Sequence, residues 1–153
     1  MTAQEMDIAK RTSRSNGASA INKDGTIRAV VPLWVEKNVD KSKTILDFGA
    51  GRYCTSTKYL RQKGFDNVIP YDLWCGYGDE LLDDQALDRT YDVVFASNVL
   101  NVQSSLDMLC ETLWQIWDTL NNGGEFICNY PSSPRKMDLT ADEVDHFIAA
   151  TLG

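Results

Sequence analysis

The fold of this chain is decided by one stretch, Thr44-Ile45-Leu46-Asp47-Phe48-Gly49-Ala50-Gly51-Arg52. Its first half is short and apolar, which is typical of a buried strand. Its two glycines let the backbone turn sharply and come close to a ligand, because no Cβ stands in the way. The segment from Thr55 to Lys63 is compatible with a helix, and Gly64 is a good residue to end it. The stretch therefore predicts a strand, a glycine turn and a helix built around a ligand.

A second apolar run, Val68-Ile69-Pro70-Tyr71, ends at Asp72 and predicts the neighbouring parallel strand. A carboxylate in the position of Asp72 can accept hydrogen bonds from both hydroxyls of a ribose. The helix that follows the glycine turn directs its free N–H groups and its positive dipole end toward the same place, which suits a carboxylate or a phosphate. Together these features predict a site for an adenosine-containing ligand.

Two classes of cofactor use this plan. A dinucleotide fingerprint requires a third small residue after the two glycines, and Cys54 is tolerable there without being diagnostic. Asp47, two residues before Gly49, would repel a pyrophosphate and attract an ammonium group. The pattern Asp-x-Gly-x-Gly after a strand resembles motif I of the class I S-adenosylmethionine (SAM) dependent methyltransferases, in which the acid helps to hold the methionine end of the cofactor. We therefore favour SAM over a nicotinamide or a flavin.

The resemblance covers roughly residues 27–130 and implies an α/β fold. That fold is a Rossmann-like three-layer αβα sandwich with a mostly parallel sheet of about five strands. By position, the two glycines would lie against the methionine portion, Asp72 on the ribose, and Leu73 or Trp74 on the adenine. The family's third glycine is replaced by Tyr53, which narrows the mouth of the site. The candidate cofactor-binding residues are Asp47, Phe48, Gly49, Ala50, Gly51, Tyr53, Asp72, Leu73, Trp74, Ser97 and Asn98.

Methyl transfer from a sulfonium is an in-line displacement with a neutral leaving group, so the main task of the enzyme is alignment, which can lower a barrier by about 7–11 kcal/mol. The resemblance consequently implies no universal catalytic residue, and the methyl acceptor stays open between nucleic acid and a small molecule. The candidate catalytic residues are Asn98 and Tyr130. Asn98 either accepts a hydrogen bond from an acceptor amine or caps a turn at a strand end.

Two alternatives to an active methyltransferase remain. The first is a non-catalytic module that binds SAM or S-adenosylhomocysteine and regulates or scaffolds a partner. The second is a nucleotide-binding oxidoreductase, which Asp47 disfavours. The cysteines Cys54, Cys75, Cys110 and Cys128 have no C-x-x-C spacing. They indicate reduced thiols in a cytoplasmic protein, without a disulfide or a metal site.

The chain has 153 residues, enough for one domain with a core of its own. We expect a flexible or ligand-ordered arm over residues 1–25 and a methyltransferase-like domain over residues 26–153. No segment is long and apolar enough to predict a membrane span, and the first residues do not resemble a signal peptide. The net charge of −7 argues against a protein that coats nucleic acid by electrostatics alone.

The remaining elements are predicted from periodicity and capping residues. Helices are expected over residues 27–39, kinked by Pro32, and over 79–87, and a third strand is expected to be vestigial or missing. A strand is predicted over 91–97, a helix from a capping box at Ser104 and Asp107 to the turn at 121–124, a strand over 125–130, and a last helix from a second capping box at Thr140. Trp114 and Trp117 are expected in the core or at its margin.

The resemblance also implies two further strands, for which no residues remain after Gly153. Without them the strand over 125–130 would be an edge of the sheet, open to unwanted pairing. We therefore expect either that the sequence belongs to a longer protein, or that this edge is covered by the N-terminal arm, a partner chain or a second copy in a homo-oligomer.

Overall fold

The computed structural model of the chain describes residues 29–100, 103, 105–129, 143, 146, 148 and 149. In these residues the fold is α/β, as predicted. The strands are β1 (Ile45–Phe48), β2 (Val68–Tyr71), β3 (Tyr91–Ala96) and β4 (Leu120–Cys128). The helical elements are α2 (Val30–Asn38), α3 (Thr55–Gln62), the 3-10 helix η1 (Ala86–Asp88) and α4 (Leu106–Thr119).

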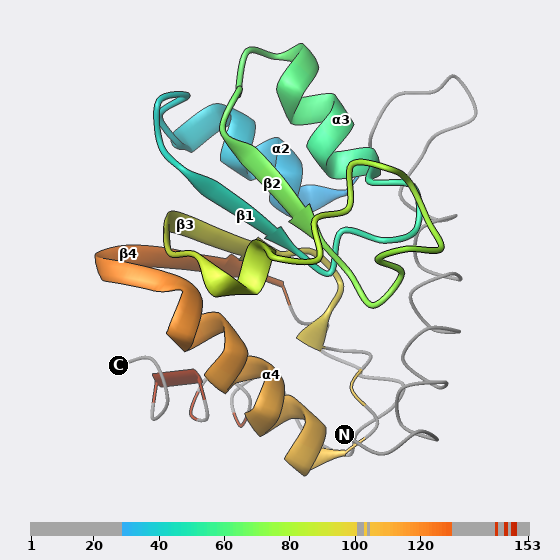
Figure 1. Ribbon diagram of the computed structural model, residues 1–153. Coiled ribbons are helices and arrows are strands. Elements are labelled where there is room, and N and C mark those ends of the chain that lie inside the picture. The colour runs from blue at the N-terminus through green and yellow to red at the C-terminus, as the bar shows by residue number, and fades with distance from the viewer. Residues whose placement is uncertain are drawn as a thin grey trace.

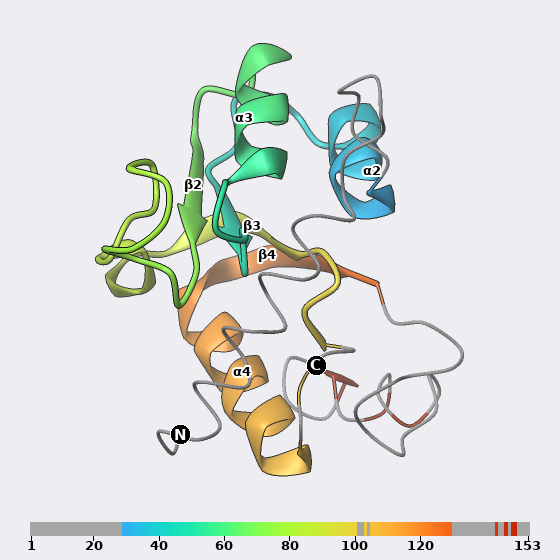
Figure 2. The same ribbon diagram turned by 90° about the vertical axis from the view of Figure 1, so that its right-hand side faces the viewer.

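The strands form one parallel sheet in the order β2-β1-β3-β4. Helices α2 and α3 lie against one face of the sheet and α4 lies against the other (Figure 1 and Figure 2). This is the predicted three-layer arrangement, compatible with a Rossmann-like sandwich that has fewer strands. Within the described residues β4 is an edge of the sheet, and the covering of that edge stays a prediction.

Apolar residues of the central strands alternate between the two faces of the sheet, as the period of a strand requires. Ile45 and Phe95 are buried on the side of α2 and α3. Leu46 and Val94 are buried on the opposite side, where Ile116 of α4 packs against them. Because both faces are covered, β1 is buried at every position, and this explains its continuous apolar character.

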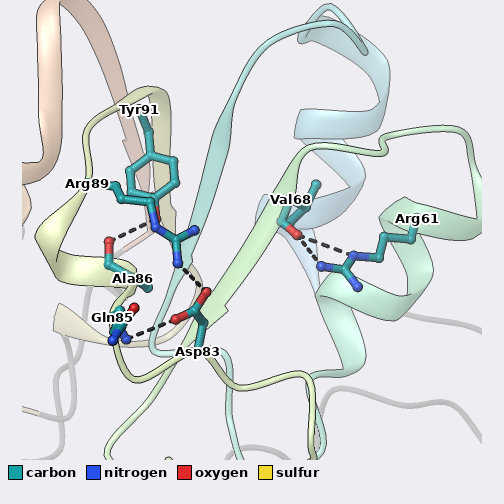
Figure 3. Close-up of polar contacts among 7 residues, drawn as sticks. All are labelled: Arg61, Val68, Asp83, Gln85, Ala86, Arg89 and Tyr91. Atoms are coloured by element: carbon teal, nitrogen blue, oxygen red, sulfur yellow. Dashed lines mark hydrogen bonds and ion pairs between the residues drawn. The ribbon is translucent and has the colours of Figure 1, made fainter.

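The predicted helices on the first face are confirmed with small changes. Helix α2 spans Val30–Asn38, and Pro32 lies in its first turn, where its missing N–H has no intrahelical partner to lose. Helix α3 ends at Gln62, and Gly64 follows with φ of +95°. The guanidinium of Arg61 donates two hydrogen bonds of 3.2 and 2.7 Å to the carbonyl of Val68, which ties α3 to β2 (Figure 3).

The helix predicted over residues 79–87 is wrong. The carboxylates of Asp79 and Asp83 accept hydrogen bonds from backbone N–H groups two residues further on, those of Leu81 and Gln85, at 3.0 and 2.9 Å. Such local bonds compete with a helix for the backbone, so the segment forms turns. No strand occurs in residues 73–90, all of which the structure describes, and this confirms the expected loss of the third strand.

The return to the sheet runs through η1, a single turn that polar contacts hold in place (Figure 3). The hydroxyl of Tyr91 donates to the carbonyl of Ala86 at 2.8 Å. The guanidinium of Arg89 forms an ion pair with the carboxylate of Asp83 at 2.6 Å. These contacts fix the start of β3 against the segment that leaves β2.

Helix α4 begins one residue later than the predicted capping box. Ser105 is its N-cap and accepts the N–H of Met108 at 3.2 Å, whereas the predicted cap, Ser104, lies outside the described residues. The helix ends at Thr119, close to the predicted end, but residues 121–124 are part of β4 and do not form the predicted turn. Pairing with β3 shifts there from Tyr91 opposite Leu120 to Val93 opposite Glu125. Regular pairing therefore starts at the predicted residue.

Several predictions fall outside the described residues: the arm over 1–25, Tyr130 and the capping box at Thr140. Glu143, His146, Ile148 and Ala149 have helical backbone, as predicted for the last helix. Ile148 packs against a cluster formed by Leu100, Leu109 and Leu113. No helix in the described ranges combines the length and apolar character that crossing a membrane requires.

Candidate functional site

The glycine turn lies at the carboxyl end of β1, beside the carboxyl end of β2. The N–H groups of Gly49 and Ala50 both donate to the carbonyl of Tyr71, at 2.8 and 2.9 Å. The ring of Phe48 lies 5.6 Å from that of Tyr71. Two of the predicted site residues thus hold the turn against the neighbouring strand, at the edge where ligands bind in open parallel sheets.

The two glycines have different surroundings. Both have positive φ, +75° for Gly49 and +81° for Gly51. A Cβ on Gly49 would lie 2.4 Å from Cγ2 of Val99, so the side chain of Val99 fills the space that this glycine leaves. A Cβ on Gly51 would meet no described atom within 4 Å. The open side of the turn is therefore at Gly51, whereas the close approach at Gly49 is made by the protein itself.

Asp72 lies beside Gly51, as the sequence predicted. Its carboxylate accepts the N–H of Gly51 at 2.9 Å and the N–H of Trp74 at 3.1 Å. The side chain is buried, with 5% of its surface exposed. Asp72 therefore joins the glycine turn to the segment after β2, and its charge is held at the open side of the turn.

Asp47 lies beneath the turn, on the face of the sheet that α3 covers. It is 1% exposed, and its carboxylate accepts the hydroxyl of Thr57 at 2.7 Å. Burial raises the pKa of Asp47 to about 7, against a hydrogen bond from Thr57 that lowers it, and the nearby charge of Asp72 raises it further. Asp47 thus changes its charge near neutral pH.

The segment after β2 folds over the glycine turn. Its backbone N–H at Asp79 donates to the carbonyl of Arg52 at 2.8 Å, and the carboxylate of Asp79 forms an ion pair with Lys58 of α3. A Cβ on Gly78 would lie 2.7 Å from the carbonyl oxygen of Arg52, so only glycine permits this approach. The predicted adenine-side residues are thereby brought to the turn.

Arg52 connects the aromatic residues of the site. Its guanidinium lies 5.5 Å from the ring of Tyr53 and 5.3 Å from the ring of Trp74. Tyr53 is 54% exposed, whereas Trp74 is buried and Leu73 is partly buried. Such cation–π contacts contribute about 0.5–1 kcal/mol at exposed sites. Arg52, Tyr53 and Trp74 thus form a group of flat side chains next to the glycine turn.

Cys54 follows the glycine turn and is fully buried. Burial raises the pKa of Cys54 to about 12, and the charge of Asp47 is the next largest cause, followed by that of Asp79. Cys54 stands at the N-cap of α3 with φ of +52° and no side-chain cap bond. Its thiol stays protonated at neutral pH, so it is not a nucleophile.

The predicted residues after β3 lie at the same edge of the sheet. Asn98 has φ of +58°, and its backbone N–H donates to Oδ1 of Asn129 at 2.7 Å. In return, Nδ2 of Asn129 donates to Oδ1 of Asn98 at 2.7 Å. The ends of β3 and β4 are thus joined by a reciprocal amide pair, and Ser97 lies beside it, partly buried.

Sequence reasoning missed several residues of this region: Thr57 on Asp47, Val99 on Gly49, Arg52 between two rings, and Asn129 on Asn98. Asn129 was predicted inside the strand over 125–130, but β4 ends at Cys128, which places Asn129 at the ligand-binding edge. The other contacts depend on tertiary packing. Among the described residues, no group of three or more His, Cys, Asp or Glu is arranged to hold a metal ion.

Comparisons of the chain with protein-family models, with curated proteins and with solved structures find no match. The geometry of the site is therefore the basis for a functional proposal.

Proposed function

We propose that this protein is a SAM-dependent methyltransferase. The observation that carries the proposal is the hydrogen bond between Gly51 and Asp72. An open glycine turn at the end of β1 is hydrogen-bonded at 2.9 Å to an acid at the end of β2. In open parallel sheets this is the position where an adenosine ribose is bound.

Charge supports SAM over a dinucleotide. The carboxylate of Asp72 lies at the turn, where it accepts the N–H of Gly51 at 2.9 Å. A pyrophosphate would be repelled there, whereas the sulfonium and ammonium of SAM would be attracted. Asp47 is buried beneath the turn and adds to this attraction only when it is ionised, because burial raises its pKa to about 7.

In this proposal the carboxylate of Asp72, which lies against Gly51 at the end of β2, accepts the ribose hydroxyls. Trp74 and Leu73 lie beside the adenine, and the uncapped N-terminus of α3 lies beside the methionine carboxylate. The methyl acceptor approaches along the ends of β3 and β4, where Asn98 and Asn129 lie. Its class stays open between nucleic acid and a small molecule. The four cysteines are free thiols, which supports a cytoplasmic location.

A second candidate is a SAM-binding module without transferase activity. The amide pair favours it, because Oδ1 of Asn98 already accepts a hydrogen bond from Asn129 at 2.7 Å. That oxygen is the atom that would accept a hydrogen bond from the amine that receives the methyl group. If the pair persists with ligand bound, the site holds the cofactor without an acceptor.

Calorimetric titration with SAM, S-adenosylhomocysteine and NAD tests the cofactor. We expect both adenosyl ligands to bind and NAD not to bind. If neither SAM nor S-adenosylhomocysteine binds, the proposal is refuted. Binding of NAD alone would indicate a nucleotide-dependent oxidoreductase. Transfer of a labelled methyl group from SAM to pools of DNA, RNA, protein and small molecules then separates the enzyme from the binding module.

A further inference from the structure

Helix α4 carries an exposed aromatic face that the site does not use. Its inner face, buried against the sheet, consists of Met108, Leu109, Thr112, Leu113, Ile116 and Thr119. On the outer face Leu106 is 43% exposed, Trp114 is 55% exposed and Trp117 is 48% exposed. The two indoles meet edge to face, with their ring centroids 5.8 Å apart. Both tryptophans were expected in the core or at its margin, and the structure places them outside the core, each about half exposed.

An acidic stripe runs beside these aromatic residues. Asp107, Glu111 and Asp118 are exposed, and their spacing of four and seven residues places them on one side of the helix. Trp114 lies between Glu111 and Asp118 on the same side. Helix α4 contains no Lys, Arg or His in its 14 residues. Its outer face therefore combines large flat apolar groups with carboxylates, and no basic residue of the helix lies among them.

We propose that this outer face of α4 is a docking surface for a basic amphipathic peptide segment of a partner protein. Paired tryptophans are the side chains most often found as binding hot spots, because they bury a large area with little loss of conformational freedom. Lys and Arg of the partner would meet the carboxylates and stack on the indoles. Helix α4 is about 21 Å long, which matches a helical partner segment of about 14 residues.

The charge pattern argues against the other occupants. In a two-fold pair of copies, antiparallel α4 helices would place Asp107 of one copy near Asp118 of the other, and these like charges repel. Nucleic acid and anionic membranes are repelled for the same reason. Helix α4 covers the face of the sheet opposite α3 (Figure 2), and its outer face points away from the sheet. Docking there is thus independent of the proposed cofactor.

The test uses the full chain and a synthetic amphipathic helix of Lys and Leu, with a Glu and Leu peptide of the same pattern as its counterpart. Binding is followed by tryptophan fluorescence and by calorimetry. We expect the Lys peptide to bind, more weakly at high salt, and the Glu peptide not to bind. Equal binding of both peptides, or binding of neither, refutes the proposal.

Variants locate the surface. We expect Trp114→Ala with Trp117→Ala to weaken Lys-peptide binding by at least about tenfold. The matched control is Trp34→Ala, since Trp34 is 44% exposed on α2 and should leave binding unchanged. Asp107→Asn with Asp118→Asn should also weaken binding, whereas the charge-matched control Asp66→Asn with Asp88→Asn should not. Circular dichroism confirms that each variant is folded.

Three results would overturn the inference. In the first, the α4 variants and their controls bind the Lys peptide equally. In the second, sedimentation shows a dimer of the wild-type chain that the double tryptophan variant abolishes, which would identify a second copy as the occupant. In the third, the surface binds vesicles of anionic phospholipid as tightly as the peptide, which would identify a membrane.

Discussion

The carboxylate of Asp72 and the backbone N–H of Gly51 are joined by a hydrogen bond of 2.9 Å across 21 residues of sequence. The same carboxylate accepts the N–H of Trp74. One acid thus orders both the glycine turn and the segment that folds over it. Asp72 therefore both holds the backbone of the candidate site in place and supplies negative charge there.

Replacing Asp72 should reduce both stability and affinity for SAM. Hydrogen bonds to a charged group contribute about 1.5–3 kcal/mol each, so Asp72→Ala should lower the free energy of unfolding by about that amount or more. We expect SAM binding to weaken at least several-fold by calorimetry. Asp72→Asn, which keeps one acceptor oxygen, should be less destabilised. Unchanged affinity in a folded Asp72→Ala protein would show that the ribose lies elsewhere.

Adding a methyl group at the two glycines of the turn should have unequal effects. Gly49→Ala combines a positive φ with a contact of 2.4 Å to Val99, whereas Gly51→Ala combines a positive φ with open space. Left-handed backbone costs about 1–2 kcal/mol for a residue with Cβ, and overpacking adds about 1–3 kcal/mol. In urea unfolding, Gly49→Ala should therefore be the less stable variant.

A second substitution checks the cause of that difference. Combining Gly49→Ala with Val99→Ala removes the clash and leaves the backbone strain. The double variant should recover stability relative to the sum of the single variants, with a coupling of about 0.5–3 kcal/mol. Simple additivity would mean that Val99 does not fill the space at Gly49.

The free energy of unfolding should depend on pH through Asp47. Its folded pKa of about 7 lies above the ordinary value of 3.8 for an aspartate, so the folded state holds the proton more tightly than the unfolded state. Stability from this group is full below about pH 4, falls as the pH rises to about 7, and is constant above it. Each pKa unit corresponds to about 1.4 kcal/mol.

Asp47→Asn isolates this effect, because the amide has no proton to lose and still offers an acceptor to Thr57. Relative to wild type, the variant should gain more than about 1.4 kcal/mol of unfolding free energy between pH 4 and pH 8. Chemical denaturation at several pH values measures the gain. A difference between the two proteins that stays constant over this range would contradict the burial of an ionisable Asp47.

The amide pair at the ends of β3 and β4 should be energetically coupled. Asn129→Ala removes the acceptor of the partly buried Asn98 N–H, and loss of such a hydrogen bond costs about 0.5–1.5 kcal/mol. A double-mutant cycle with Asn98→Ala should give a coupling of about 0.5–3 kcal/mol in thermal unfolding. If the two substitutions are additive, the pair does not hold these strand ends together. A labelled-methyl assay of Asn129→Ala then shows whether release of Asn98 changes transfer.

Local sequence was sufficient where one short segment determines its own conformation. The apolar runs ending at Phe48 and Tyr71 form β1 and β2. The glycines after Phe48 make the turn, because a residue without Cβ adopts positive φ at no steric cost. The helix predicted over 79–87 failed because Asp79 and Asp83 bind nearby backbone N–H groups. Periodicity does not register such competition between side chain and backbone.

The sequence by itself determined the parallel sheet, the glycine turn and the acid beside it. The spacing and type of the residues are enough to predict where these strands and this turn lie along the chain. Only the tertiary structure decided that Val99 fills the space at Gly49, that Asn129 pairs with Asn98, and that the tryptophans of α4 face outward. It also decided the charge state of Asp47, because desolvation depends on atoms that distant segments bring around a carboxyl group. Burial is a property of the packed chain, and no single segment carries it.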